Sequence, residues 1–279
     1  MTEQAEIVRR REPLDVHQVD ENSCLTCVAA NLLYVLGITG TPDTRWVDRE
    51  LGREPGCAAQ RTAARRFLLQ QGLCLQMVCA YEPERFLQEG LDYLRRYYHR
   101  EWDPSWDEHW TRHRLLQHRH ECLATQELST FGARMRTEHR APTLADIRDA
   151  LDRGHLVWIS VDNDWDQVDC HAVLVYGQRG NVFDVYSPEI SRSCLQQYCG
   201  RRLDRMWLRS EGMTAVVAMT RSATAGGRGR AAFPRASPVP ARSGWRGPPR
   251  PGPRAAIAAR ASAHATGHRR RAARRRCGW

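Results

Sequence analysis

The residues best suited to covalent chemistry lie near the N-terminus, where Gln18 precedes Cys24 by six residues in the run HQVDENSCLTC. An apolar stretch from Val28 to Leu36 follows at once and predicts a helix that begins at the cysteine. A thiol in the first turn of a helix has a lowered pKa, because the positive end of the helix dipole favours the thiolate. Cys24 is therefore the candidate nucleophile. The Gln18 carboxamide and the Cys24 backbone N–H could together form an oxyanion hole.

A histidine far downstream begins a predicted β-hairpin. Residues 171–177 have the pattern of one strand, residues 178–181 that of a turn, and residues 182–188 that of the returning strand. Nucleophilic cysteine catalysis requires a cysteine and a histidine that are distant in sequence and adjacent in the fold. His171 is therefore the candidate general base for Cys24.

Three elements in this order resemble the bacteriocin-processing, double-glycine-leader cysteine peptidases and their free-standing relatives in the papain-like clan. They are Gln-x-Asp-x-x-x-Cys at 18–24, the segment LDRGHLVWISVD at 151–162, and the hairpin at 171–188. The resemblance covers residues 10–220 and implies an α+β fold, in which the nucleophile helix packs on a C-terminal antiparallel sheet. It also implies a thiol hydrolase that acts on a peptide or amide bond, in a peptide or a small molecule, through an acyl-enzyme. Acyl transfer by the same thiol and a catalytically inactive, peptide-binding pseudoenzyme are the alternatives.

The resemblance implies a third catalytic residue, usually an Asp directly before a Pro and about sixteen residues beyond the His, but Ser187 stands there. If the hairpin folds symmetrically about Arg179, Ser187 lies across from His171 with a Cβ separation of about 5 Å. Asp184 then points to the opposite face, because side chains alternate along a strand. Ser187 could accept the Nδ1–H bond of His171 but could not stabilise an imidazolium by charge. Glu189 as a substitute, or a slipped register that brings in Asp184, stays open.

The positive charge of the chain is concentrated at its C-terminal end. Residues 221–279 contain 15 of the 42 basic residues and no acidic residue, which leaves 27 basic against 32 acidic residues in 1–220. Arg, Ala, Gly and Pro dominate the C-terminal segment, so it cannot bury enough apolar surface to offset its ordering entropy. The sequence predicts one domain over 1–220, with a helical insertion at 82–140 over the cleft, and a disordered tail. The Arg-rich run at 269–276 could bind nucleic acid or other acidic surfaces nonspecifically, but a solvated tail without function is favoured.

The compartment is inferred from what the sequence lacks. No run of 18 apolar residues is present, so no membrane insertion is expected. The charged N-terminus, residues 1–11, lacks the apolar core of a signal peptide. A cytoplasmic protein is therefore expected, and its ten cysteines are expected to be reduced.

Cys24 and Cys27 also form a CxxC motif, which could be a redox pair or half of a zinc site. The polar loop at 11–20 is not the strand that precedes a thioredoxin-like motif, and no second pair follows at zinc-finger spacing. Catalysis by Cys24 is favoured, with Cys27 in the core.

A cluster of histidines at 109–120 raises the question of a metal site. His109 and His113 are four residues apart, on one face of a predicted helix, and could bind a metal with a third ligand. No Glu lies between them in the HExxH arrangement, so a polar lid helix is favoured. No metal or cofactor is predicted.

Hydrophobic periodicity predicts mainly helices in the first half of the chain and strands in the second. Helices are expected at 24–36, 43–52, 57–71, 82–101, 104–124 and 143–153. Strands are expected at 73–80, 156–162, 171–177, 182–187 and 213–220. This order indicates an α+β fold.

Overall fold

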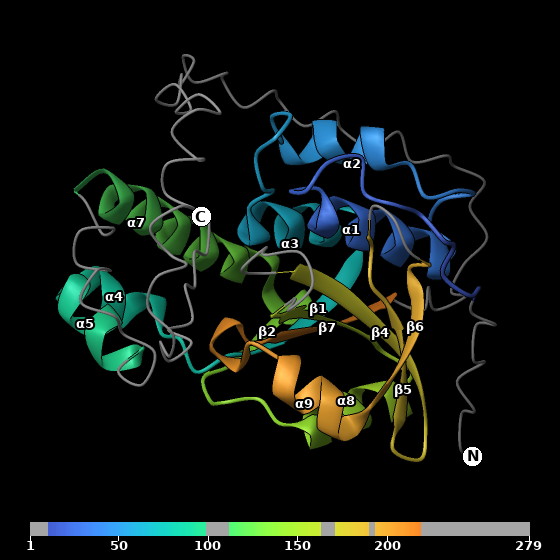
Figure 1. Ribbon diagram of the computed structural model, residues 1–279. Coiled ribbons are helices and arrows are strands. Elements are labelled where there is room, and N and C mark those ends of the chain that lie inside the picture. The colour runs from blue at the N-terminus through green and yellow to red at the C-terminus, as the bar shows by residue number, and fades with distance from the viewer. Residues whose placement is uncertain (1–10, 99–111, 163–170, 190–192, 219–279) are drawn as a thin grey trace, which may run out of the picture. The chain divides into compact units, whose positions relative to one another are not determined.

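The computed structural model describes residues 11–98, 112–162, 171–189 and 193–218 (Figure 1). The described residues belong to one compact unit. The predicted disordered tail at 221–279, its Arg-rich run and His109 lie outside the described residues. Among the helices that the structure describes, none has the length and apolar character needed to cross a membrane.

The described residues combine helices with one sheet. The helices are α1 (Cys24–Val35), α2 (Thr44–Leu51), α3 (Arg61–Gln70), α4 (Pro83–Glu89), α5 (Leu91–Tyr97), α7 (Arg112–Glu127), α8 (Leu144–Asp152) and α9 (Gly200–Met206), with 3-10 turns η1 (Leu128–Arg134) and η2 (Arg209–Glu211). The strands are β1 (Leu73–Val78), β2 (Met135–Glu138), β3 (Leu156–Val161), β4 (His171–Arg179), β5 (Val182–Tyr186), β6 (Leu195–Cys199) and β7 (Met213–Ala218).

The seven described strands form a single sheet in the order β2-β1-β7-β3-β4-β5-β6. β1 and β2 are parallel, whereas the other neighbouring pairs are antiparallel. The α+β class is confirmed, but the sheet is mixed rather than antiparallel throughout. The parallel pair is possible because the long helical segment between β1 and β2 supplies the crossover that parallel strands require.

Several boundaries differ from those predicted by hydrophobic periodicity. The predicted helix at 82–101 is divided at Gly90, whose φ of +60° interrupts the helix between α4 and α5. β2 and β6 were not predicted because each lies at an edge of the sheet and buries few side chains. α9, a seven-residue helix, was also not predicted, since its sequence GRRLDRM contains few apolar residues.

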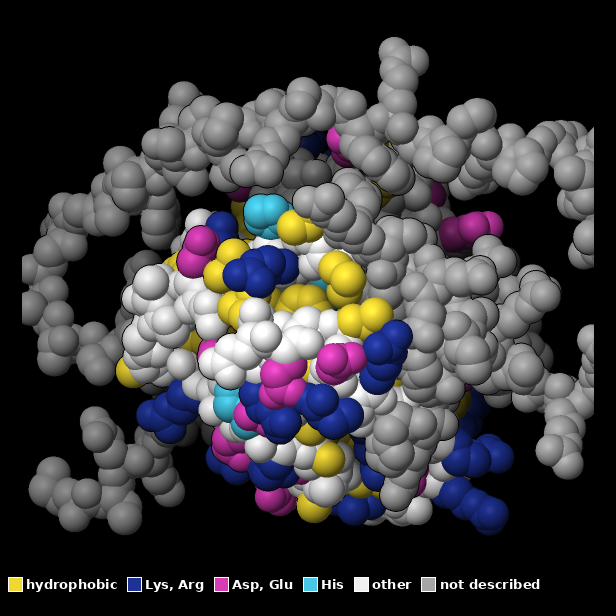
Figure 2. All heavy atoms as spheres, turned by 90° about the vertical axis from the view of Figure 1, so that its left-hand side faces the viewer, with side chains coloured by type: hydrophobic (Ala, Val, Ile, Leu, Met, Phe, Trp, Pro, Cys, Tyr) yellow, Lys and Arg dark blue, Asp and Glu magenta, His cyan; other side chains and the backbone are white. Residues whose placement is uncertain are grey.

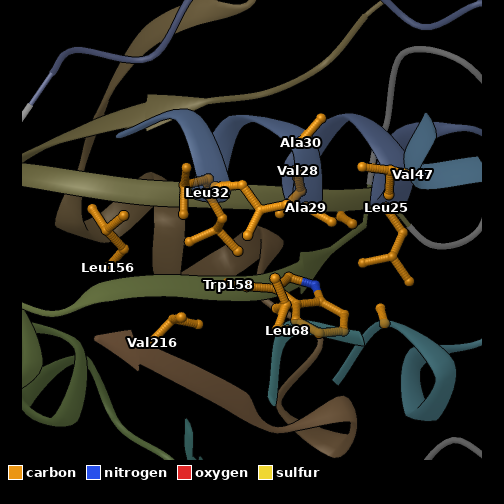
Figure 3. Packing of buried hydrophobic residues seen from close by; sticks show 14 of the residues in the cluster. Leu25, Val28, Ala29, Ala30, Leu32, Val47, Leu68, Leu156, Trp158 and Val216 are labelled. Atoms are coloured by element: carbon orange, nitrogen blue, oxygen red, sulfur yellow. The ribbon is translucent and has the colours of Figure 1, made fainter. Parts of the chain in front are cut away.

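The helix that carries the candidate nucleophile lies in the centre of the core. Ten of the twelve residues of α1 are buried, and most of them are apolar, as expected for a helix enclosed by other elements. In Figure 3, Leu25 and Leu32 of α1 lie against the sheet residues Leu156 and Trp158, and Leu68 of α3 lies beside Trp158. Each fully buried Leu contributes about 1.5–3 kcal/mol, so the position of α1 on the sheet is strongly fixed.

The segment predicted as an insertion forms a smaller core of its own. Phe86, Tyr93 and Leu94 of α4 and α5 pack with Cys122 of α7. These helices lie beyond the β2–β1 end of the sheet (Figure 1), and β7 and β3 separate β1 from the strand that carries His171. Figure 2 shows this side, where hydrophobic side chains are exposed among charged ones. The described part of the insertion ends in a strand, β2, so the insertion is not wholly helical.

Candidate active site

Cys24 and His171 are brought together by the packing of α1 on β4. Cys24 is the first residue of α1 and is half-buried. Its Sγ accepts a hydrogen bond from the backbone N–H of Ala172, at 3.5 Å, and Ala172 directly follows His171 in β4. The thiol thus lies at the start of β4, beside the histidine, although the two residues are 147 positions apart in sequence.

The imidazole of His171 is buried and held between two side chains. Its Nε2 lies 3.2 Å from Ser187 Oγ, and its Nδ1 lies 3.4 Å from Gln18 Nε2. A carboxamide N–H can donate only to a ring nitrogen with a lone pair, so the contacts suit a neutral ring protonated on Nε2. Ser187 then accepts the Nε2–H bond, and Nδ1 is left as the base.

The sequence prediction for this contact was wrong in its atom and its register. Ser187 was expected at Nδ1 and directly across from His171, in a hairpin symmetric about Arg179. Instead Arg179 pairs with Val182, a bulge follows between Val175 and Gly177, and beyond the bulge Leu174 pairs with Tyr186. The turn-side register alone would place Ser187 across from Leu174, and the extra residue at the bulge moves its partner back by one, to Val173.

Ser187 lies just beyond the end of β5, where its N–H donates to the Cys194 carbonyl at 2.7 Å. Continuing the observed register places Ser187 across from Val173, two residues from His171 on the same face of the sheet. The Ser187 hydroxyl therefore contacts His171 as a diagonal neighbour on β4, not as its directly opposite cross-strand partner.

Asp184 does not lie at the candidate site. It pairs with Gly177, and its Oδ1 accepts hydrogen bonds from Arg179 at 3.2 Å and from Gln197 at 2.9 Å. Gly177 is six residues beyond His171, so Asp184 lies roughly 20 Å along the strand from the imidazole. The slipped register that would bring Asp184 to the histidine does not occur in this structure.

Glu189, the other carboxylate considered from the sequence, is buried near the same loop. Its Oε1 accepts a hydrogen bond from Gln196 Nε2 at 2.9 Å, and its backbone carbonyl accepts one from His17 Nδ1 at 2.9 Å. The side chain is thus held by a residue of β6.

Gln18 reaches the site from the loop that precedes α1. Its Nε2 donates to the Pro188 carbonyl at 2.7 Å and lies 3.4 Å from His171 Nδ1. The carboxamide has two N–H donors, and the contact to Nδ1 is the longer one. A substrate carbonyl oxygen could displace this longer contact while the bond to Pro188 keeps the amide in place.

Ser23 folds the loop between Gln18 and Cys24. It is the N-cap residue of α1 but makes no side-chain capping bond to the helix. Instead its Oγ accepts hydrogen bonds from the N–H groups of Val19 and Asp20, at 3.1 and 3.3 Å, and donates to the Asp20 carbonyl at 2.9 Å. The hydroxyl therefore organises the turn that presents the nucleophile.

A buried arginine joins this loop to the helices behind it. Arg53, with only 3% of its side chain exposed, forms ion pairs with Asp20 at 3.0 Å and with Asp48 at 2.6 Å. Asp48 in turn accepts a hydrogen bond from Thr26 of α1 at 2.6 Å. The two carboxylates satisfy the guanidinium, as a buried charge requires.

The ion pairs are reflected in the acidity of Asp20. Burial alone disfavours its charged form, but the hydrogen bonds from Arg53 and from the N–H groups of Asn22 and Gly56 outweigh burial and lower the Asp20 pKa. The hydrogen bonds to Asp48, followed by those to Asp20, raise the pKa of Arg53. No local sequence pattern links Asp20 to an arginine 33 residues away, so this network could not be predicted from the sequence.

Cys27 differs in environment from Cys24 although it lies one turn further along α1. It is fully buried, its Sγ–H donates to the His17 carbonyl at 3.6 Å, and burial above all raises its thiol pKa to about 12. A thiol with this pKa is almost entirely protonated at neutral pH. Cys27 is a core residue in this structure.

The histidine cluster of the insertion is only partly described, because His109 and the side chain of His113 lie outside the described residues. Tyr81 Oη lies 2.7 Å from His118 Nε2 and 3.5 Å from Cys122 Sγ. Among the described side chains, the one group of His, Cys, Asp and Glu close enough to share a metal ion is elsewhere, at Asp15, His17 and Cys194.

Comparison with known proteins yields structural similarities only. No family model matches the sequence, and no curated protein matches it. The peptidase domain of Streptococcus ComA, a bifunctional ABC transporter involved in a quorum-sensing pathway, is similar at 10% identity and a TM-score of 0.37, over 72% of this chain and 94% of that domain. A double-glycine motif protease from an AMS/PCAT transporter, solved with its leader peptide, is similar at 12% identity and a TM-score of 0.38, over 75% of this chain and 91% of the protease.

One of these proteins is thus a peptidase domain of a transporter and the other a double-glycine motif protease. What the active site of this chain can do follows from its own residues.

Proposed function

We propose that the protein is a cysteine peptidase-like thiol hydrolase, which acts on a peptide or amide bond. The observation that carries the proposal is the hydrogen bond from Ala172 N–H to Cys24 Sγ, which brings the thiol to the start of β4 beside His171. A helix-terminal thiol next to a buried, oriented imidazole is the arrangement that nucleophilic cysteine catalysis uses.

In the proposed reaction, His171 Nδ1 takes the proton of the Cys24 thiol, and the thiolate attacks the carbonyl carbon of the substrate. The Cys24 backbone N–H and the Gln18 carboxamide stabilise the oxyanion that forms. The imidazolium then gives its proton to the leaving amine, which departs and leaves an acyl-enzyme. Water, activated by the same imidazole, attacks this thioester and regenerates the thiol.

Ser187 has a positioning role in this proposal, because it holds Nε2 and so leaves Nδ1 to act as the base. A hydroxyl supplies no negative charge to stabilise the imidazolium. The same acyl-enzyme could also pass its acyl group to an amine, so transfer is a second outcome of the same chemistry.

A binding module without turnover is the candidate from a different class. Two observations favour it: the neutral Ser187 where a carboxylate is usual, and the engagement of Gln18 with Pro188 and with the base itself. This candidate predicts that Cys24 behaves as an ordinary thiol.

We assign the activity to residues 1–220 and the protein to the cytoplasm, where its thiols stay reduced. The assignment to 1–220 is supported by the positions of all the candidate site residues, which lie between Gln18 and Ser187.

Alkylation of the folded full-length chain with limiting iodoacetamide, followed by mass mapping, tests the proposal. Cys24 should react ahead of Cys57 and Cys199, which are more exposed but lie outside the active site. His171→Ala should slow the alkylation of Cys24 and leave the other two thiols unchanged. If Cys24 reacts no faster than Cys57, and His171→Ala changes nothing, the chain is not a thiol enzyme of this kind.

A further inference from the structure

Asp15, His17 and Cys194 form a cluster on the outer side of the loop that carries Gln18. One ligand atom from each of the three side chains lies within 4.8 Å of the other two. Asp15 and His17 come from the segment before α1, whereas Cys194 comes from the segment before β6. The catalytic proposal gives none of the three side chains a role.

The separation of two of these atoms suits a tetrahedral metal ion. Cys194 Sγ lies 3.5 Å from His17 Nδ1. Zinc–sulfur and zinc–nitrogen bonds of about 2.3 and 2.05 Å, at a tetrahedral angle, give a ligand separation of about 3.6 Å. Two donors that are already at this distance need little rearrangement to share one ion.

The exposure of the cluster leaves one side open to water. Cys194 is fully buried, while the side chains of His17 and Asp15 are 44% and 46% exposed. A metal ion could thus approach from solvent past the carboxylate and imidazole and meet the thiol from outside. Both exposed side chains can adjust their rotamers to reach it.

The protonated cluster is held by hydrogen bonds that metal binding would partly replace. Cys194 Sγ–H donates to the Val16 carbonyl at 3.4 Å, and His17 Nδ1–H donates to the Glu189 carbonyl at 2.9 Å. The Cys194 N–H donates to Asp15 Oδ1 at 2.7 Å, and this bond can persist in the bound state. Burial above all raises the pKa of the Cys194 thiol to about 12, so the free thiol keeps its proton at neutral pH.

We propose that Asp15, His17 and Cys194 bind one zinc-type divalent ion, with water as the fourth ligand. One thiolate, one imidazole and one carboxylate suit zinc better than magnesium or calcium, which prefer oxygen ligands alone. The ion forms a bond to Cys194 Sγ as the thiol proton leaves to solvent, and it takes His17 as the Nε2–H tautomer.

The bound ion connects the two segments that hold the base. His17 directly precedes Gln18, and the Cys194 carbonyl accepts the N–H bond of Ser187. The ion therefore acts as a structural cross-link between the loops on both sides of His171, and it contacts no substrate.

Cobalt titration of the full-length Cys24→Ala variant tests the site, because tetrahedral Co²⁺ with one thiolate has visible ligand-field bands and a near-ultraviolet charge-transfer band. Both should saturate at one Co²⁺ per chain and be reversed by Zn²⁺. Cys194→Ser should abolish the charge-transfer band. Cys199→Ser, which removes an exposed thiol of β6, should leave the band unchanged.

Cys194 is buried, so Cys194→Ser could lose the band through misfolding. Asp15→Asn and His17→Asn serve as second variants, because substitutions at these exposed positions should leave the fold intact. Each should weaken Co²⁺ binding by at least about tenfold, the minimum cost seen even for outer-shell partners. His139→Asn, at another exposed histidine, should not. An absence of Co²⁺ bands, or bands indifferent to Cys194→Ser, would overturn the site. Because Cys24 is absent throughout, the result is independent of the proposed catalysis.

Discussion

His171 Nε2 lies 3.2 Å from Ser187 Oγ, and the hydroxyl reaches the ring from a position just past the end of β5. This contact fixes the imidazole without supplying charge. A carboxylate at the same position would fix it equally and also favour the imidazolium form. The relationship between these two residues therefore determines how strongly the site can hold a thiolate–imidazolium pair.

Replacing Ser187 by Asp should increase the reactivity of Cys24 at low pH. The introduced carboxylate stabilises the protonated imidazole, and the imidazolium stabilises the thiolate. The pH profile of iodoacetamide alkylation at Cys24, measured by mass mapping, should extend to lower pH. Asp184→Ala is the matched control and should not alter the profile, because Asp184 is bonded to Arg179 and Gln197 instead.

A reversed outcome would contradict the geometry of the site. If Asp184→Ala abolished Cys24 reactivity while Ser187→Asp had no effect, the register observed between β4 and β5 would not be that of the active protein. If Cys24 already reacted like an ordinary thiol and neither substitution changed its pH profile, the binding-module candidate would be favoured.

Gln18→Ala should reduce turnover far more than it reduces alkylation. The loss of one oxyanion donor typically costs 10²–10³-fold in kcat, whereas iodoacetamide alkylation forms no oxyanion. Hydrolysis of an activated amide or thioester substrate and alkylation of Cys24 should be measured on the same preparation. Gln88→Ala, which removes an exposed carboxamide of α4 in the insertion, is the control. An equal loss in both measurements would mean that Gln18 orients His171 rather than the oxyanion.

The sequence predicted the elements that bury a continuous apolar face. Cys24 at the start of a helix and His171 at the start of a strand follow from local patterns, because apolar periodicity and polar flanks determine where these elements begin. The strands at the sheet edges have no such pattern, since they are stabilised by backbone pairing more than by burial.

The rest of the site depends on relationships that no local pattern contains. Ser187 misses its expected partner because the turn is centred between Gly180 and Asn181 rather than on Arg179, and the bulge between Val175 and Gly177 recovers only one residue of that shift. A bulge of this kind has no signature in the hairpin sequence. Likewise, the pairing of Arg53 with Asp20 is set by how α2 packs on α1. Both features became visible only once the long-range packing was known.

Arg53→Met should both destabilise the domain and slow the alkylation of Cys24. Removing the guanidinium leaves Asp20 and Asp48 without their partner, which costs about 2–3 kcal/mol, somewhat below the usual value for a fully buried pair because both carboxylates are partly exposed. Urea unfolding gives the stability, and iodoacetamide alkylation gives the thiol reactivity. Arg45→Met, on the exposed side of α2, should change neither. If stability fell while Cys24 reacted normally, the network would not position the nucleophile.

His118 provides a separate test in the insertion, far from the catalytic residues. It is half-buried, its Nε2 lies 2.7 Å from Tyr81 Oη, and it lines a small cavity with Arg61, Arg65 and Glu121. Burial lowers its pKa to about 4. The folded protein thus resists protonating a histidine that the unfolded chain protonates near pH 6.5.

Acidification should therefore destabilise the protein through His118 between pH 6.5 and 4. In this window the unfolded chain binds a proton that the folded chain does not, so the stabilisation is fully present above pH 6.5 and is lost as the pH falls towards 4. The loss should reach about 2–3 kcal/mol. The free energy of urea unfolding should be measured at each pH for the wild type and for His118→Gln. The difference between the two values cancels the contributions of Glu121 and the other shared groups. His139→Gln, at an exposed histidine, should follow the wild type. Parallel curves for the wild type and His118→Gln would show that His118 is protonated equally in both states.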